Sequence, residues 1–116
     1  MNIEQSRASW QAEPCPPWCV REHHDNDHPD DRYHDSDTTL VSAVMADRDR
    51  LGGAGRWTHE TAELAIVTSR YDDATQLITF IGRDDRPDQH LVMTPESAER
   101  LAQALIRHLA MMAERR

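Results

Sequence analysis

The chain has 116 residues, of which 38% are hydrophobic and 5% aromatic, and its formal net charge is −8 at pH 7. This length and composition predict one domain with a small core. The negative charge repels phosphate, so direct nucleic-acid binding is not expected. No apolar run is long enough to span a bilayer and no signal segment is recognisable, so we expect a cytoplasmic protein without a membrane anchor.

The N-terminal third lacks the periodicity of a helix or a strand. Residues 1–14 are polar apart from Trp10, and we expect a mobile arm or one short turn there. Residues 15–37 contain both cysteines and four of the seven histidines of the protein. This concentration of soft and borderline donors predicts a metal-binding segment.

The spacing C-x3-C-x3-H-x10-H supplies two thiolates and two imidazoles, which is the donor set of a closed tetrahedral Zn²⁺ site. The predicted ligands are Cys15, Cys19, His23 and His34. His24 and His28 remain alternatives for the third ligand. Asp25 and Asp35 are candidates to orient the imidazoles. The spacing fits neither the thioredoxin motif nor the zinc deaminase motif, so a structural role for the zinc is favoured over a catalytic one.

From residue 38 the sequence alternates between β-branched stretches and turns. Strands are predicted over residues 39–46, 62–69, 76–81 and 90–93, with a glycine-rich loop after the first. A helix is predicted over residues 95–113, because Thr94 is a favourable N-cap and Pro95 suits the first helical position. Its apolar residues recur at helical spacing and form one stripe.

These elements predict an α+β fold. Strands joined by short turns favour an antiparallel meander of three to four strands, and the amphipathic helix is expected to pack on one of its faces. Residues 38–113 would form this core, and the arm, the zinc-binding segment and the core would make up one domain.

The run Cys15-Pro16-Pro17-Trp18-Cys19, followed by His23 and by a histidine before a β-segment, resembles a family of small actinobacterial domains of unknown function. The run from Thr94 to Ala102 is similar to the final helix of that family. The resemblance implies a metal-binding N-terminal loop, a small sheet, a closing helix and no established activity.

The sequence contains no recognisable catalytic constellation. We therefore expect a zinc-stabilised interaction or regulatory module without catalytic activity, whose partner is another protein or a second copy of the chain. The alternative is a zinc-dependent enzyme, or a zinc-sensing regulator with an exchangeable histidine ligand.

Overall fold

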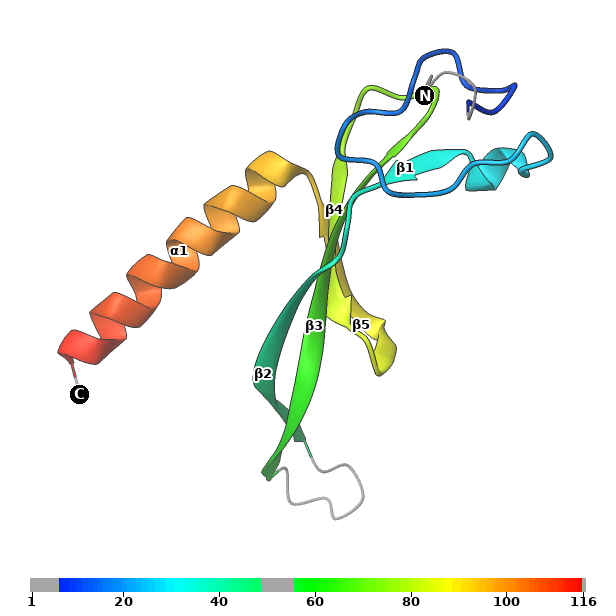
Figure 1. Cartoon of the computed structure of the whole chain (residues 1–116). Coiled ribbons are helices and arrows are strands. Elements are labelled where there is room, and N and C mark those ends of the chain that lie inside the picture. The colour runs from blue at the N-terminus through cyan, green and yellow to red at the C-terminus, as the bar shows by residue number, and fades with distance from the viewer. Residues whose placement is uncertain (1–6, 49–55, 116) are drawn as a thin grey trace.

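The computed structural model describes residues 7–48 and 56–115 (Figure 1). Within them, a five-stranded antiparallel sheet is followed by one C-terminal α-helix, which confirms the α+β class. The elements are η2 (Pro29–Asp31, a 3-10 helix), β1 (Tyr33–Asp35), β2 (Thr39–Arg48), β3 (Trp57–Tyr71), β4 (Ile78–Arg83), β5 (Arg86–Met93) and α1 (Pro95–Glu114). The prediction of three to four strands was too low, because β1 lies inside the segment expected to be loop.

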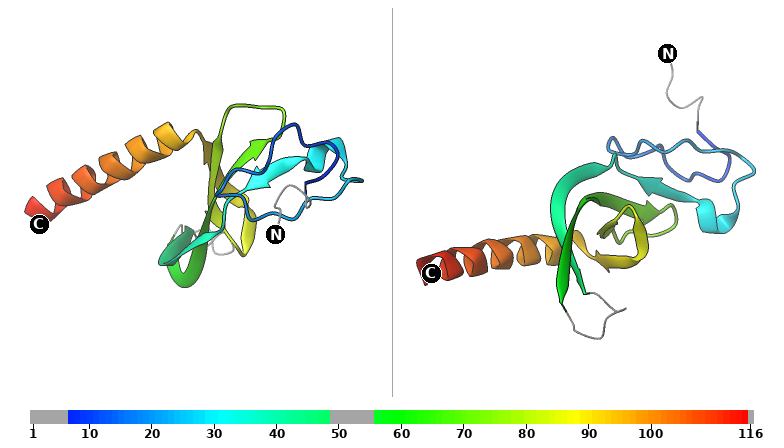
Figure 2. Two further views of the ribbon diagram at one scale, coloured as in Figure 1. Left: turned by 45° about the horizontal axis from the view of Figure 1, so that its top comes forward. Right: turned by 90° about the horizontal axis from the view of Figure 1, so that it is seen from below.

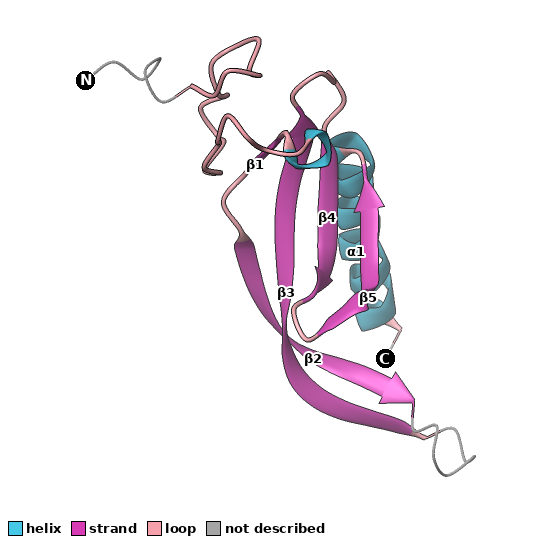
Figure 3. Cartoon of the chain, turned by 90° about the vertical axis from the view of Figure 1, so that its right-hand side faces the viewer, coloured by secondary structure: helices cyan, strands magenta, loops and turns pink. Residues whose placement is uncertain are grey.

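β3 is the central strand of the sheet. On one side it pairs first with β2 and then, near its C-terminal end, with β1. On the other side it pairs with β4, which pairs with β5, so β2 to β5 form the predicted meander. β1 and β2 thus lie end to end along one edge of β3 (Figure 3). Between them, Ser36 N donates to Thr68 O at 2.8 Å, and Thr68 N donates to Ser36 Oγ at 2.9 Å.

β2, β3 and β5 are longer than the sequence predicted, whereas β4 has the predicted length but begins two positions later than residue 76. β3 has 15 residues where residues 62–69 were expected, and β5 has 8 where residues 90–93 were expected. The five residues added at the N-terminal end of β3 pair only with β2 and are mainly polar, so no apolar alternation reveals them. Arg70 and Tyr71, added at the other end, pair with β1. The glycine-rich loop was predicted over residues 47–59; its two ends belong to β2 and β3, and residues 49–55, which contain its glycines, lie outside the described residues.

A buried arginine of β4 links β2 and β3 near the end of β2 and the start of β3. Arg83 is 3% exposed, and its guanidinium donates to Asp47 at 3.1 Å, to Glu60 at 2.7 Å and to Asp85 at 2.9 Å. The hydrogen bonds with Asp85, Glu60 and Asp47 raise the pKa of Arg83. In return, Arg83 lowers the pKa of Asp47 and that of Asp85. Three carboxylates therefore compensate the buried charge of Arg83, although no large apolar core surrounds it.

The C-terminal helix forms as predicted but does not cover the sheet. Thr94 caps it, since Thr94 Oγ1 accepts a hydrogen bond from Ser97 N at 3.2 Å. No described residue of α1 is buried, and α1 projects away from the sheet (Figures 1 and 2). The expected packing of the helix on the sheet was therefore wrong. Thr94 alone connects β5 to α1.

Little of the apolar surface is buried. Among the described residues, the buried hydrophobic side chains are those of Ala8 and Ala62. Neither α1 nor η2, the helices found in the described part of the chain, combines the length and apolar character of a membrane span.

Candidate metal centre

The two cysteines are held by a proline-stiffened turn. Cys19 N donates to Pro16 O at 3.0 Å, which closes a β-turn with Pro17 at its second position, where proline is favoured. Cys15 precedes this turn. Cys19 also forms an isolated antiparallel bridge with Ser36, so the turn is attached to the chain just after β1. The turn thereby brings both thiols to the end of the sheet.

The strand β1 supplies His34, whose side chain is 1% exposed. His34 Nε2 lies 2.9 Å from Asp72 Oδ1, in the turn after β3. His34 Nδ1 is buried and has no hydrogen-bond partner among the described residues. A buried nitrogen is costly to leave unpaired, and a histidine that donates to a carboxylate through one nitrogen commonly binds a metal through the other. His34 Nδ1 is thus available as a metal ligand.

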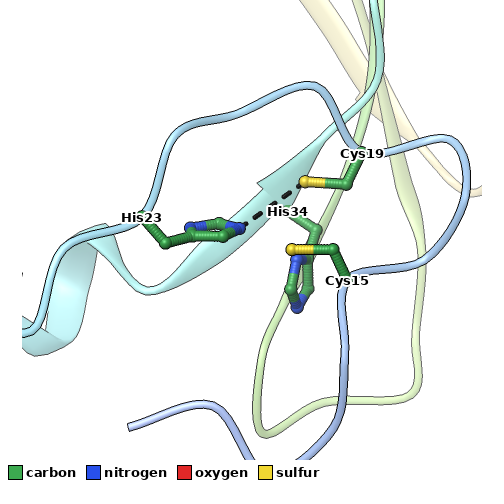
Figure 4. Close-up of side chains that lie close together, drawn as sticks. All are labelled: Cys15, Cys19, His23 and His34. Carbon is green, nitrogen blue, oxygen red and sulfur yellow. Dashed lines mark hydrogen bonds between the residues drawn. The ribbon is translucent and has the colours of Figure 1, made fainter. Parts of the chain in front are cut away.

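The four predicted ligands come together in the structure (Figure 4). One donor atom from each of Cys15, Cys19, His23 and His34 lies within 4.8 Å of the others. His23 Nε2 is 3.6 Å from Cys19 Sγ. A tetrahedral site with Zn–S of about 2.3 Å and Zn–N of about 2.1 Å places the two donor atoms about 3.6 Å apart. This separation therefore matches two ligands of one zinc ion, and the four residues form a group that could hold a metal.

Aromatic rings surround the two histidines. The ring centroid of Trp10 is 5.2 Å from that of His23, and Trp18 is 6.4 Å from His34, both edge-on. The rings of His23 and His34 are 5.1 Å apart. The two indoles thus place apolar surface beside the imidazoles, where electrostatic interactions are less screened than in water.

Residues of the predicted N-terminal arm also contact the site. Gln11 is 6% exposed; its Oε1 accepts from Ala8 N at 2.7 Å, and its Nε2 donates to Cys15 Sγ at 3.3 Å. Gln11 N donates to Ala8 O at 3.1 Å, which forms the short turn expected in this region. The described part of the arm thus supplies a hydrogen bond to one of the thiols.

Burial changes the proton affinities of two donors. It raises the pKa of the Cys15 thiol, and the hydrogen bond from Gln11 acts in the opposite direction. Burial lowers the pKa of His23, and its neighbour His34 lowers it further. The lowered pKa of His23 favours the neutral imidazole that a metal ligand requires, whereas Cys15 would have to lose its proton on binding a cation.

The two alternative histidines lie outside this cluster. The His24 side chain is 58% exposed, and its backbone carbonyl accepts from Trp10 Nε1 at 2.7 Å. His28 caps η2, since its Nδ1 accepts from Asp30 N at 3.1 Å. The structure thus places His23, rather than His24 or His28, beside the cysteines.

The carboxylate next to the cluster is Asp72, which the sequence did not indicate. Of the two candidates that it did indicate, Asp35 contacts Arg21 and Ser69, and Asp25 accepts from Ser9 N at 2.7 Å. Asp72 is 38 positions from His34, and only the pairing of β1 with the end of β3 brings the two together. A sequence pattern read within the Cys/His segment does not contain this information.

Comparisons with known proteins identify a family. Residues 4–116 match the family described as "Domain of unknown function (DUF6907)". Searches of the curated proteins and of the solved structures each gave no match. Because the match includes the Cys/His segment, the sheet and the final helix, the chain belongs to the DUF6907 family.

Proposed function

We propose that Cys15, Cys19, His23 and His34 bind one structural Zn²⁺ ion, and that the chain is a zinc-stabilised interaction module without catalytic activity. The observation that carries this proposal is the convergence of four nitrogen and sulfur donors within 4.8 Å. The unpartnered, buried Nδ1 of His34 supports it, because a metal ion would satisfy that atom.

A metal would supply the stability that the N-terminal segment otherwise lacks. Ala8 is the buried hydrophobic residue in the described part of this segment. One methyl group contributes on the order of 1 kcal/mol of hydrophobic free energy, whereas a structural zinc site binds with about 10–16 kcal/mol. Zinc bound here would join the proline turn, the loop at His23 and strand β1, so metal binding and folding of the segment would be coupled.

The donor set favours a structural metal over a catalytic one. A catalytic zinc ion usually has three protein ligands and a water molecule at the fourth position. Four protein donors at these separations would complete the tetrahedral shell, and the indoles of Trp10 and Trp18 lie beside both imidazoles. The proposed activity is therefore the presentation of a folded surface to another protein.

Metal analysis of ligand and control variants tests the zinc site. Untagged wild-type protein should contain one Zn²⁺ per chain, measured by elemental analysis and native mass spectrometry. Cys15→Ser and His34→Ala should lose the metal to a competing chelator. His24→Ala and His28→Ala, which remove neighbouring histidines outside the cluster, should retain it. A metal-free wild type, or equal losses in ligand and control variants, would reject the proposal.

The absence of catalysis needs a separate test. In protein loaded with Co²⁺ in place of zinc, the visible absorption of a closed tetrahedral shell should not change when azide is added. Azide-dependent bands would indicate an open coordination position, and they would favour the enzymatic alternative.

A further inference from the structure

The surface of the chain is much larger than that of a folded monomer of its mass. Its accessible surface is 9204 Å², whereas a monomer of 13.3 kDa exposes about 6,450 Å². Its radius of gyration is 19.1 Å, compared with about 13 Å for a globular domain of 116 residues. The excess is about 2,750 Å², and even half of it is larger than the roughly 800 Å² that each partner buries in a standard interface. The chain therefore has enough uncovered surface for a stable dimer.

Part of this surface is one side of the sheet. The register places Val41 beside Leu64, Ile66 beside Ile81, and Ile81 beside Leu91. We call these five residues the apolar sheet face; they extend without interruption across β2, β3, β4 and β5. Val41 is 42% exposed and Leu91 is 52% exposed. A sheet that buries one face normally packs it against a second layer.

The other part is the helix. The helix stripe, which faces one direction at 3.6-residue spacing, consists of Ala98, Leu101, Ala102, Leu105, Leu109 and Met112. Leu105 is 53% exposed and Leu109 is 58% exposed. α1 has 20 residues and is about 30 Å long, whereas four adjacent strands at about 4.8 Å spacing span about 14 Å. The helix stripe is therefore long enough to cross the apolar sheet face.

Within one chain the helix stripe and the apolar sheet face do not cover each other. β5 ends at Met93, and α1 begins at Pro95, so Thr94 alone connects the two elements. With Thr94 as its N-cap, α1 projects away from the sheet, and none of its described residues is buried (Figure 1).

We propose that the chain forms a two-fold symmetric homodimer in which α1 of each copy lies on the apolar sheet face of the other. A second copy of the chain is the partner that fits, because each chain carries both a helix stripe and an apolar sheet face. Exchange of the helices would cover these two surfaces in both copies. Exchange of one element between identical chains gives a closed, isologous assembly. This inference does not depend on the metal centre, which is built from other segments.

Sedimentation equilibrium and light scattering test the assembly. At about 100 µM the wild type should have twice the 13.3 kDa chain mass. The double variant Leu105→Glu, Leu109→Glu should weaken dimerisation at least about 100-fold. Ala104→Glu adds a charge on another side of α1, near Arg100 and Arg107, and should remain dimeric. Unchanged far-UV circular dichroism and metal content would show that the variants are folded.

Cross-linking tests the exchanged geometry. A photoreactive benzoylphenylalanine at Ile106, beside the helix stripe, should link to the β4–β5 hairpin. In a mixture of ¹⁵N-labelled and unlabelled protein, these links should join chains of different label. A monomeric wild type, a dimer that survives the double substitution, or links confined to single chains would each overturn the proposal.

Discussion

Replacing Asp72 with asparagine should weaken metal binding although Asp72 is not itself a proposed ligand. Asp72 Oδ1 lies 2.9 Å from His34 Nε2, and its side chain is 13% exposed. The carboxylate orients the imidazole and increases the basicity of the nitrogen that faces the metal. Removing such a partner typically reduces affinity 10–100-fold, which corresponds to about 1.4–2.7 kcal/mol. We expect Asp72→Asn to raise the Kd for Zn²⁺ by this factor.

The Kd is measured by competition with a chromophoric chelator at constant pH. Asp73→Asn is the matched control, because Asp73 follows Asp72 in the sequence, is exposed, and loses the same charge on substitution. This variant should change the Kd for Zn²⁺ less than about threefold, since solvent and salt screen the exposed carboxylate of Asp73. Equal Kd values for Asp72→Asn and the wild type would refute the assignment of His34 Nδ1 as the metal-binding nitrogen.

Three further results are expected. Removal of the metal by a chelator should increase hydrogen exchange in the N-terminal segment while the β2–β3 hairpin keeps its protection, and equal exchange with and without metal would contradict the structural role. Gly82→Ala should destabilise the protein by about 1–3 kcal/mol in urea titrations, because an added Cβ would lie 2.7 Å from Phe80 Cζ and 2.9 Å from His90 Cβ. Arg83 lowers the pKa of Asp47 in the folded state, so the stability that this carboxylate contributes is present above about pH 4 and is lost as the pH falls below it. Asp47→Asn should make the urea midpoint less dependent on pH in that range, and an unchanged pH dependence would argue against the ion pair.

The local features of the fold could be predicted from the sequence. Thr94 and Pro95 begin the C-terminal helix as expected, and the apolar alternation located four of the strands approximately. β1 was missed because Tyr33–Asp35 is short, lies in an acidic stretch and is stabilised by pairing with the distant end of β3. The position of the helix was also not predictable, because periodicity shows which side of a helix is apolar but not what covers it.

The candidate metal site, too, was predictable from the sequence only in part. Both cysteines and four of the seven histidines of this chain lie in residues 15–37, and their local spacing was enough to locate the group that the structure brings together. The choice of His23 over His24 and His28 depends on the path of the loop. The backbone carbonyl of His24 accepts from the Trp10 indole, and His28 Nδ1 accepts from Asp30 N. The role of Asp72 depends on tertiary contact, and a single sequence without that contact does not reveal it.

We propose that the thiols of Cys15 and Cys19 and the imidazoles of His23 and His34 form a closed zinc shell. X-ray absorption spectroscopy at the zinc edge of untagged protein reports the ligands of the ion. We expect two sulfur ligands at about 2.3 Å and two nitrogen ligands at about 2.0–2.1 Å. A shell that contains fewer than two sulfur atoms, or a water oxygen in place of one imidazole, would contradict it.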